Sequence, residues 1–305
     1  MTYLIFTLGL IGLFFGGEFL VRGASNIART YRISPMVIGL TIVGFGTSTP
    51  ELLVSLNAAL KGVPAIAIGN VLGSNIANIL LILGVAALIT PILIPLSRLW
   101  RDLAVMAGAT ALIWVMLLDG AVSRLEGGIL LAGLVGFLAM SFLVVRVDDA
   151  DDEAPPPPIW RSALLTVGGL VILMVGARLL VDSATDIALT FGISEAVIGL
   201  TIVAVGTSLP ELATSLIAAW RNQMDIAVGN IIGSNIFNIL GILGLTTLIL
   251  PITTVDPRFA AVDMLWVAGA AAAVIALSAF PGRIPRIGGA ALLASYAGYV
   301  ALMNV

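Results

Sequence analysis

The chain has 305 residues, of which 60% are hydrophobic and only 10% are charged, and its mean hydropathy is +1.14. A soluble globular protein is about half apolar and about a quarter charged, so the 14 basic and 17 acidic residues of this chain are too few to cover a water-exposed surface. This composition excludes a water-soluble enzyme and a disordered chain, and the lack of a basic stripe excludes nucleic acid as a partner. The sequence predicts an all-α polytopic protein that lies in a lipid bilayer.

Cysteine and histidine are both absent from the sequence. Their absence excludes disulfides, thiolate-bound zinc and thiol catalysis, and it removes the most common general base. Any bound metal must have oxygen ligands, which favours hard cations such as Ca²⁺, Na⁺ or Mg²⁺. We therefore expect a protein that is not an enzyme and has no cofactor, and the sequence indicates no obligate protein partner.

Ten apolar stretches are long enough to span a bilayer, which takes about 20 residues of helix. They cover residues 2–22, 35–60, 64–90, 99–118, 125–146, 159–181, 195–219, 225–250, 259–280 and 284–304. The first stretch has neither the basic start nor the small-residue cleavage site of a signal peptide, so we expect it to remain as a helix.

Two sequence motifs recur at a constant offset of 160 residues. VIGLTIVGFGTSTPEL at 37–52 matches VIGLTIVAVGTSLPEL at 197–212 in thirteen of sixteen positions, without a gap. GNVLGSNIANIL at 69–80 matches GNIIGSNIFNIL at 229–240 in nine of twelve positions. Chance does not supply this agreement within one chain, so the two halves are an internal duplication.

Each half contains five predicted spans, and an odd number inverts the second half relative to the first. We predict a first five-helix repeat at 1–147, a solvated cytoplasmic linker at 148–158, where the chain is acidic and rich in proline, and an inverted five-helix repeat at 159–305. Weak attraction of cations is a second interpretation of the acidic linker. Inverted repeats with a site near the bilayer midplane are typical of secondary transporters.

The basic residues predict the orientation in the cytoplasmic membrane, because loops rich in Arg and Lys stay in the cytoplasm. One side carries nine of them: Arg29, Arg32, Arg98, Arg101, Arg146, Arg161, Arg221, Arg283 and Arg286. The other side carries Lys61, Arg124 and Arg258. The richer side is predicted to be cytoplasmic, which places both chain termini outside.

Glu51 and Glu211 lie well inside apolar spans, at equivalent positions of the two repeats. An ionised carboxylate costs a few kcal/mol in hydrocarbon, so it normally faces a cavity, a partner or an ion. No Lys or Arg occupies an equally deep matching position. We therefore predict that a cation or bound protons neutralise these two carboxylates in a site built from two half-sites.

The neighbouring residues offer oxygen ligands for a cation. Thr47 lies four residues before Glu51, and Thr207 lies four residues before Glu211, so each pair shares one helix face. The proline directly before each glutamate removes a helical hydrogen bond and frees backbone carbonyls for a ligand. The second motif places polar side chains along one helix face in both repeats: Asn70, Ser74 and Asn78, then Asn230, Ser234 and Asn238. Ca²⁺ takes about six to eight such oxygens.

Structural roles are the alternative for part of this set. Small residues in apolar spans usually serve close helix packing, which is the second interpretation of Gly73, Gly233, Ser48 and Ser208. An asparagine alone fits an interhelical hydrogen bond as well as a ligand, which applies to Asn78 and Asn238. A structural role for the two glutamates would require a partner that the sequence does not show.

A charged pair near the end of the first span recurs in the sixth span with its charges exchanged. Glu18 and Arg22 are four residues apart, as are Arg178 and Asp182. We expect ion pairs that neutralise one another at helix ends, and a gate contact is the second interpretation.

The doubled GTSxPEL and GNxxGSNIxNIL motifs within five-plus-five spans resemble the α-repeats of the cation/Ca²⁺ exchanger (CaCA) superfamily, and most of all the prokaryotic Na⁺/Ca²⁺ exchangers. The resemblance covers the whole topology, and its specificity comes from the second, third, seventh and eighth spans. It implies that these spans form a central cluster and that the first and sixth spans slide across it as a tilted pair to give alternating access.

The resemblance also implies a ligand set for Ca²⁺ and Na⁺. In the first repeat it comprises the Gly44 carbonyl and the side chains of Thr47, Ser48, Glu51, Ser74 and Asn78. In the second repeat it comprises the Ala204 carbonyl and the side chains of Thr207, Ser208, Glu211, Ser234 and Asn238.

One position departs from the family pattern. The archaeal Na⁺/Ca²⁺ exchangers have an aspartate in the eighth span where this chain has Asn238. Two formal negative charges remain, and one Ca²⁺, two monovalent ions or two protons would neutralise them. The H⁺/Ca²⁺ exchangers of the superfamily usually carry a different glutamate motif, so Na⁺ remains the first choice of counter-ion.

The resemblance therefore implies an antiporter that exports Ca²⁺ against inward Na⁺, with an antiporter driven by H⁺ or another cation as the alternative. A cation channel is the rival from a different class, because channels also use midplane carboxylates. A channel needs a continuous open path and usually symmetric subunits, and two inverted half-sites in one chain argue against it.

Overall fold

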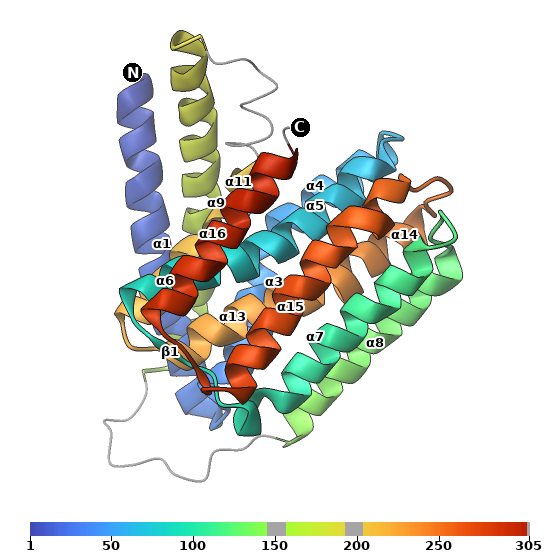
Figure 1. Ribbon diagram of the computed structural model, residues 1–305. Helices are drawn as coiled ribbons and strands as arrows, with labels where there is room; N and C mark the ends of the chain where they lie inside the picture. Colours follow the sequence, from blue (N-terminus) through green and yellow to red (C-terminus); the bar gives the residue numbers. More distant parts are fainter. Residues whose placement is uncertain (145–156, 193–203, 304–305) are drawn as a thin grey trace. The chain divides into compact units, whose positions relative to one another are not determined.

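The computed structural model describes residues 1–144, 157–192 and 204–303, and Figure 1 traces the chain through them. The described part is helical apart from two short paired strands and an isolated bridge. Most of the predicted linker at 148–158 and the first nine residues of the predicted span at 195–219 lie outside the described residues.

Eight helical segments among the described residues are long and apolar enough to cross a membrane. They are Thr2–Tyr31, Pro64–Ile89, Leu96–Leu117, Arg124–Phe142, Ile159–Thr190, Met224–Ile249, Phe259–Ala279 and Arg286–Met303. A ninth is the pair Pro35–Thr47 and Thr49–Leu60, which bends by 44° at Ser48. These segments match nine of the ten predicted spans and confirm an all-helical polytopic membrane protein, while the tenth span and the inversion stay predictions.

The chain divides into two compact units that each draw on both repeats. Unit 1 comprises residues 1–50 and 145–230, and unit 2 comprises residues 51–144 and 231–305. Two of the three boundaries, at 50/51 and 230/231, fall inside the repeated motifs, and Glu51 belongs to unit 2 whereas Glu211 belongs to unit 1. The two predicted repeats are segments of the sequence and do not coincide with these two units. The limits of the repeats, 1–147 and 159–305, stay a prediction.

Unit 1 is built around two long helices, α1 (Thr2–Tyr31) and α9 (Ile159–Thr190). Its shorter elements are α2 (Pro35–Ile38), the π-helical turn η1 (Gly39–Val43), α3 (Gly44–Thr47), α11 (Ala204–Gly206), α12 (Leu209–Trp220) and the first part of α13 (Met224–Ile236). At 1.5 Å per residue α1 is about 45 Å long, more than the hydrocarbon core requires. Both long helices extend about nine residues beyond the apolar stretches predicted at 2–22 and 159–181.

Close backbone contact between α1 and α9 explains their glycines (Figure 1). A Cβ built on Gly16 would lie 2.7 Å from the backbone nitrogen of Leu173, and one on Gly169 would lie 2.5 Å from that of Leu20. Real Cβ atoms do not come this close, so only glycine allows the two helices to pack at this distance. Small residues of this kind let membrane helices gain van der Waals contact.

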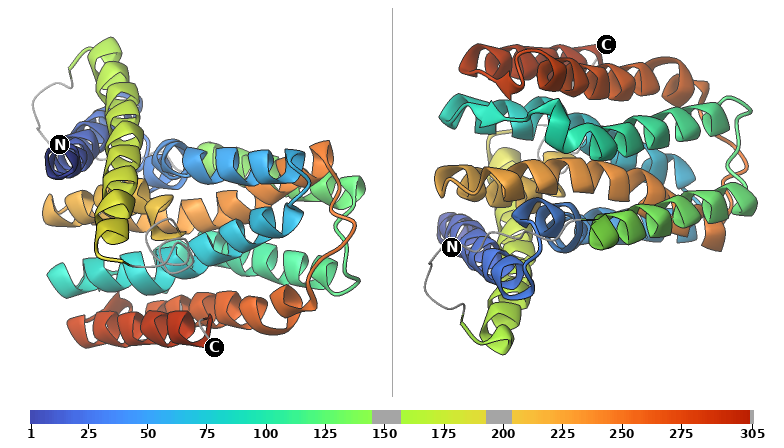
Figure 2. Two further views of the ribbon diagram at one scale, coloured as in Figure 1. Left: turned by 90° about the horizontal axis from the view of Figure 1, so that it is seen from above. Right: turned by 90° about the horizontal axis from the view of Figure 1, so that it is seen from below.

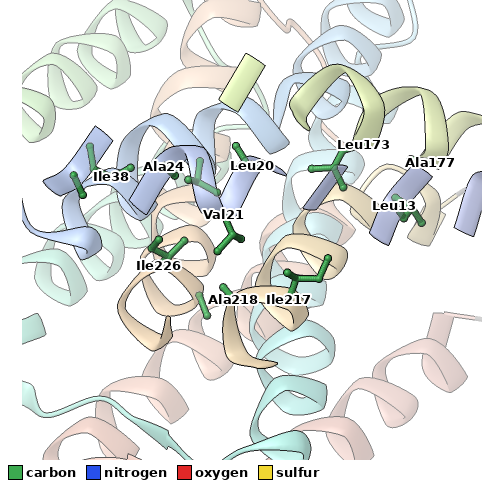
Figure 3. Close-up of a cluster of buried hydrophobic side chains, with 13 residues drawn as sticks. Leu13, Leu20, Val21, Ala24, Ile38, Leu173, Ala177, Ile217, Ala218 and Ile226 are labelled. Carbon is green, nitrogen blue, oxygen red and sulfur yellow. The ribbon is translucent and has the colours of Figure 1, made fainter. Parts of the chain in front are cut away.

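A buried apolar cluster joins these two helices to the rest of unit 1. Figure 3 shows Leu13, Leu20 and Val21 of α1 beside Leu173 of α9 and Ile217 of α12. Ile38 and Ile226 complete the cluster from α2 and α13. The cluster therefore includes the helix that carries Glu211.

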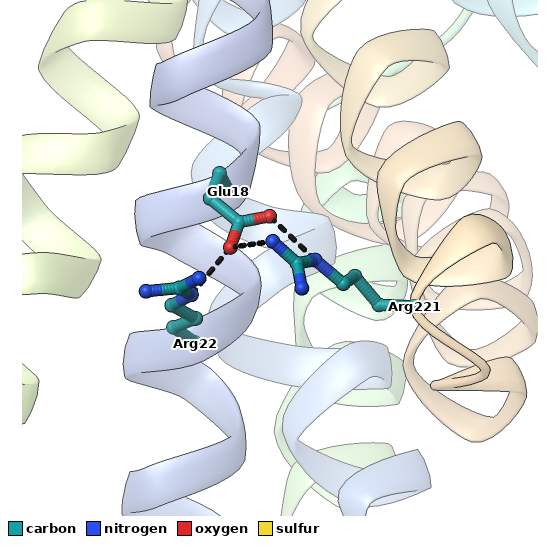
Figure 4. Close-up of polar contacts among 3 residues, drawn as sticks. All are labelled: Glu18, Arg22 and Arg221. Carbon is teal, nitrogen blue, oxygen red and sulfur yellow. Dashed lines mark hydrogen bonds and ion pairs between the residues drawn. The ribbon is translucent and has the colours of Figure 1, made fainter.

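Glu18 of α1 is held by two arginines (Figure 4). Its Oε2 accepts from Nε of Arg221 at 2.9 Å, its Oε1 accepts from Nη2 of the same guanidinium at 2.6 Å, and Arg22 pairs with it from the next helical turn. The Glu18 side chain is 6% exposed, and Arg221 caps the C-terminal end of α12. The expected pair with Arg22 is thus present and extended by Arg221.

The repeat-related pair is different. The Nε atom of Arg178 lies 3.7 Å from Oδ2 of Asp182, and the two side chains are 84% and 68% exposed. The two equivalent positions therefore carry one buried and one exposed ion pair.

Unit 2 contains most of the remaining helices. They are α4 (Thr49–Leu60, from Glu51 onward), α5 (Pro64–Ile76), η2 (Ala77–Leu83), α6 (Gly84–Ile89), α7 (Leu96–Leu117), α8 (Arg124–Val144), the end of α13, η4 (Phe237–Leu243), α14 (Gly244–Ile249), η5 (Phe259–Asp263), α15 (Met264–Ala279) and α16 (Arg286–Met303). Figure 2 shows α16 beside η2 and α6, with which it is in contact.

Short backbone pairings join the loops of unit 2. Strand β1 (Ile92–Leu93) pairs antiparallel with β2 (Arg283–Ile284), and Val122 forms an isolated bridge with Ile252. Two loops that pair in this way lie at the same end of the unit.

The contact between α1 and α9 gives a first prediction. Gly169→Ala places a Cβ against the Leu20 backbone, so we expect a loss of about 1–3 kcal/mol in the free energy of unfolding. Gly168→Ala is the matched control, because a Cβ there meets no atom within 4 Å. Thermal unfolding in detergent measures both variants, and equal stability of the two would contradict the close packing.

The two ion pairs give a second prediction. Arg221→Leu leaves the buried Glu18 with Arg22 alone, and we expect a loss of about 1–3 kcal/mol, below the cost for a fully buried pair because Arg221 is partly exposed. Arg178→Leu breaks the exposed pair and should cost less than about 0.5 kcal/mol. Thermal unfolding of the two variants measures the difference between their losses of stability. Equal losses would show that burial of Glu18 does not add to the stability that its ion pair contributes.

Candidate functional site

Both glutamates lie in the first turn of a helix that begins just after a break. Ser48 precedes α4 with φ/ψ of −81°/8°, and Ser208 precedes α12 with −88°/7°. These angles are in the bridge region, which is rare in regular helix and frequent at functional sites. The proline two residues after each serine cannot donate to the preceding turn. The repeated sequence thus breaks the helix at the same point twice.

Unit 1 holds Glu211 in a buried polar environment. Its side chain is 1% exposed, and its Oε1 accepts a hydrogen bond from Oγ of Ser48 at 2.8 Å. Its Oε2 is buried and accepts no hydrogen bond from the residues that the structure describes. A hydroxyl donor satisfies one oxygen of a carboxylate, and the second oxygen is left to bind a cation or a proton.

Thr47 lies beside this carboxylate group, on the helix before the break. Its Oγ1 lies 3.1 Å from the carbonyl oxygen of Val43 and 3.1 Å from Oδ1 of Asn230. The single hydroxyl proton serves one of these acceptors at a time. The two lone pairs of the hydroxyl stay available to a cation.

The two glutamate helices are held by the same hydrogen bonds in the two units. In unit 1, Nδ2 of Asn230 donates to the carbonyl oxygen of Glu211 at 3.4 Å and to Oγ of Ser215 at 2.9 Å. In unit 2, Nδ2 of Asn70 donates to the carbonyl oxygen of Glu51 at 3.1 Å and to Oγ of Ser55 at 2.9 Å. The structure therefore repeats this arrangement at the sequence offset of 160.

Unit 2 contains Glu51 together with four polar residues from the second motif. Glu51 is 1% exposed, and the others are no more than 5% exposed: Ser74, Asn78, Ser234 and Asn238. Asn78 lies in η2 and Asn238 lies in η4, and each of these π-helical segments follows a straight α-helix. A π-helical turn widens the helix and is frequent at functional sites.

The two asparagines differ in their hydrogen bonds. Nδ2 of Asn238 donates to Oδ1 of Asn75 at 3.0 Å, which realises the interhelical hydrogen bond considered from the sequence. Its Oδ1 is buried and accepts no hydrogen bond from a described residue. Both polar side-chain atoms of Asn78 are likewise buried without a hydrogen bond in the described part of the chain.

The remaining predicted positions lie around the break in unit 1. The carbonyl oxygen of Gly44 accepts a hydrogen bond from the backbone of Ser48 at 3.1 Å, as in a continuous helix, and it lies 3.3 Å from Oγ1 of Thr47. Ala204 is the first residue of α11, Thr207 is half-buried and Ser208 is buried. Thr207 Oγ1 has no hydrogen-bond partner among the described residues.

Unit 1 therefore brings together Thr47, Ser48 and Glu211, and unit 2 contains Glu51 with the serines and asparagines of the second motif. Three residues with direct contacts to this set were not singled out from the sequence: Ser55, Ser215 and Asn75. All three recur at the offset of 160 residues, and this recurrence is the signal that identifies them.

Comparison with known proteins places this arrangement in a family. The family model described as sodium/calcium exchanger protein matches residues 1–143 and 161–305. The chain belongs to the sodium/calcium exchanger family. Its all-helical fold is that of the sodium/calcium exchanger from Methanococcus jannaschii, with a TM-score of 0.86 and 37% identity over 99% of both chains.

Two relatives match over most of their length. The chain is 43% identical to the putative antiporter CaxA of Alkalimonas amylolytica, over 97% of this chain and 96% of that protein. It is 33% identical to the sodium/calcium exchanger MaX1 of Methanosarcina acetivorans, over 84% of this chain and 85% of that protein. The chain is thus a cation/Ca²⁺ antiporter of the CaCA superfamily, a transporter rather than an enzyme.

The repeated hydrogen bonds to the glutamate helices give a third prediction. Asn230→Ala removes two donated hydrogen bonds and an acceptor for Thr47 at a fully buried position, whereas Asn70→Ala removes two donated bonds at a half-buried one. We expect the antiporter to lose about 1 kcal/mol more stability with Asn230→Ala than with Asn70→Ala. Thermal unfolding in detergent measures this difference, and a larger loss with Asn70→Ala would contradict it.

Proposed function

We propose that the antiporter exchanges Ca²⁺ for Na⁺ by alternating access at a site near the bilayer midplane, built around Glu51 and Glu211. The observation that carries this proposal is the burial of both glutamates, each 1% exposed, at equivalent positions of an internal repeat in a sodium/calcium exchanger chain. An acid in an apolar helix requires a counter-charge, and the transported cation supplies one.

The proposed ligands are side-chain and backbone oxygens of both repeats. They are Gly44, Thr47, Ser48, Glu51, Ser74 and Asn78 with Ala204, Thr207, Ser208, Glu211, Ser234 and Asn238. Support comes from the buried oxygen of Glu211 and from the amide oxygen of Asn238, which accept no hydrogen bond from described residues. Carboxylate, hydroxyl, amide and carbonyl oxygens are the ligands that Ca²⁺ prefers.

Competition for two charges explains coupled exchange. One Ca²⁺ neutralises the two carboxylates, and so do two monovalent cations, but the site does not accept both loads together. Without a bound cation the site keeps two negative charges, so moving its access from one side of the membrane to the other through the apolar interior is unfavourable. This constraint suppresses movement without a bound ion and couples the two fluxes.

Ten spans and an inverted second repeat form part of the proposal. Two loops that pair lie on the same side of the bilayer, so an even number of crossings separates β1 from β2. Five of the described membrane-length segments lie between these strands, from Leu96–Leu117 to Phe259–Ala279. An even number therefore favours one further crossing between α9 and α13, where the sequence predicts the span at 195–219.

We place the antiporter in the cytoplasmic membrane with both termini outside, on the distribution of Arg and Lys. In that orientation the paired strands β1 and β2 and the predicted linker at 148–158 face the cytoplasm. The bridge between Val122 and Ile252 then lies on the outer side.

A flux experiment tests the proposed exchange. Proteoliposomes preloaded with Na⁺ should take up ⁴⁵Ca²⁺, whereas vesicles preloaded with choline should not. Uptake that follows a pH gradient and ignores Na⁺ would favour H⁺ as the counter-ion, which Asn238 in place of an acid makes the second candidate. Uptake that needs no counter-gradient would indicate a channel.

Substitution of the glutamates gives a fourth prediction. Glu51→Gln or Glu211→Gln keeps the shape of the side chain and removes the charge, so we expect uptake to fall by at least about 100-fold with the fold intact. Glu126→Gln is the control, because Glu126 accepts hydrogen bonds from Ser123 at an exposed helix start. Full exchange by either glutamate variant would refute the proposed site.

A further inference from the structure

The side-chain amide of Asn75 links two helical segments of unit 2, and Asn75 is not among the proposed ligands. It is 1% exposed. Its Nδ2 donates to the backbone carbonyl oxygen of Asn235 at 3.2 Å, and its Oδ1 accepts from Nδ2 of Asn238 at 3.0 Å. Asn75 near the end of α5 thus contacts the end of α13 and the start of η4.

The carbonyl of Asn235 fixes the direction of both hydrogen bonds. A backbone carbonyl only accepts, and a side-chain amide has one donor end and one acceptor end. Asn75 must therefore turn its nitrogen toward Asn235 and its oxygen toward Asn238. Asn238 in turn must present its nitrogen to Asn75, which leaves its Oδ1 pointing away from this contact. That buried oxygen is the one that accepts no hydrogen bond from a described residue.

We propose that Asn75 is a positioning residue that holds the amide of Asn238 with its oxygen toward the transported cation. This inference rests on the proposed function, in which Asn238 is a ligand. Without Asn75 the amide can rotate by half a turn and present its N–H groups to the cation, which repel it. Hydrogen bonds from a second layer of residues hold ligands in most metal sites, and losing one costs about 10- to 100-fold in affinity.

The same geometry selects an amide over a carboxylate at position 238. An ionised aspartate has no N–H to donate, so one of its oxygens would face Oδ1 of Asn75. Rotation of Asn75 removes that repulsion but turns its oxygen against the carbonyl of Asn235 and loses the hydrogen bond there. Asn75 therefore keeps a neutral ligand at this position and limits the site to the two charges of the glutamates.

The first repeat does not share this arrangement among the described residues. The repeat-related counterpart of Asn75 is Asn235, whose Nδ2 donates to the carbonyl oxygen of Ile231 in its own helix at 2.7 Å. The counterpart of Asn238 is Asn78, whose polar atoms have no hydrogen bond in the described part of the chain. Of the two equivalent asparagines, Asn238 is therefore the one whose side-chain amide is held in a fixed orientation by a described residue.

The Ca²⁺ dependence of uptake tests the role of Asn75. In proteoliposomes preloaded with Na⁺, we expect Asn75→Leu to raise the KM for Ca²⁺ about tenfold and to leave the maximal rate near that of the wild type. Asn235→Leu is the matched control, because it replaces an equally buried asparagine and keeps the backbone carbonyl that Asn75 contacts. The control should leave the KM unchanged, and an unchanged KM in Asn75→Leu would overturn the inference.

A double-mutant cycle separates positioning from general packing. If Asn75 acts through Asn238, the variant with both Asn75→Leu and Asn238→Ala has the same KM as Asn238→Ala alone, because no amide is left to orient. Two independent tenfold effects would instead multiply to about 100-fold, and that result would contradict the proposed role.

Asn75→Ala gives an independent test if Asn75→Leu does not fold, and Asn75→Asp is its matched partner. Alanine removes the acceptor for Nδ2 of Asn238, whereas an aspartate keeps an acceptor oxygen there in either protonation state. We expect Asn75→Ala to raise the KM about tenfold and Asn75→Asp to keep it near the wild-type value. Equal KM values in the two variants would overturn the inference. Lack of Ca²⁺ uptake by the wild type would contradict the proposed function itself, whereas normal wild-type uptake with unaltered variants contradicts only the role of Asn75.

Discussion

Burial of the Glu211 carboxylate limits which side chains can surround it. The Glu211 side chain is 1% exposed, and its Oε1 accepts a hydrogen bond from the hydroxyl of Ser48, which comes from the other repeat. Hydroxyl donors offset only part of the loss of water around an ionised acid in an apolar environment. The residues around it are therefore those that tolerate or bind a positive ion: threonine, serine and asparagine. The helix break at Ser208 and the hydrogen bond from Nδ2 of Asn230 to the backbone carbonyl oxygen of Glu211 position the first turn of the helix that carries this acid.

The membrane fold and the positions of the acids could be predicted from the sequence, because both depend on patterns that are local in the chain. Apolar runs of spanning length predicted eight segments that are membrane-length helices among the described residues, and a ninth that is a pair of helices bent by 44°. The recurrence at 160 residues identified the two glutamates as equivalent, and in the structure both lie in the first turn of a helix that follows a break. The helices α1 and α9 extend about nine residues beyond the apolar stretches predicted at 2–22 and 159–181, because hydropathy marks the segment that lies in hydrocarbon and not the end of the helix.

The hydrogen-bond directions at the site could not be predicted. Asn75 stands in the same repeated motif as Ser74 and Asn78, and nothing in its type or spacing separates a ligand from a residue that orients one. The distinction comes from the carbonyl of Asn235, a backbone group that carries no sequence signal. The division into two units could not be predicted from the sequence either. Each unit takes segments from both repeats, and the boundaries at 50/51 and 230/231 fall within the motifs.

The guanidinium of Arg221 has a mechanical consequence. It lies at the C-terminal end of α12, which carries Glu211 in its first turn, and it donates two hydrogen bonds to Glu18 in the middle of α1. Two parallel hydrogen bonds between a guanidinium and a carboxylate fix the relative orientation of the two groups, whereas a single hydrogen bond lets them rotate. If α1 moves along its axis, either α12 moves with it, or the hydrogen bonds between Arg221 and Glu18 break. In the second case the buried Glu18 carboxylate is left poorly solvated. Binding of a cation at Glu211 and movement of α1 would then be coupled through α12.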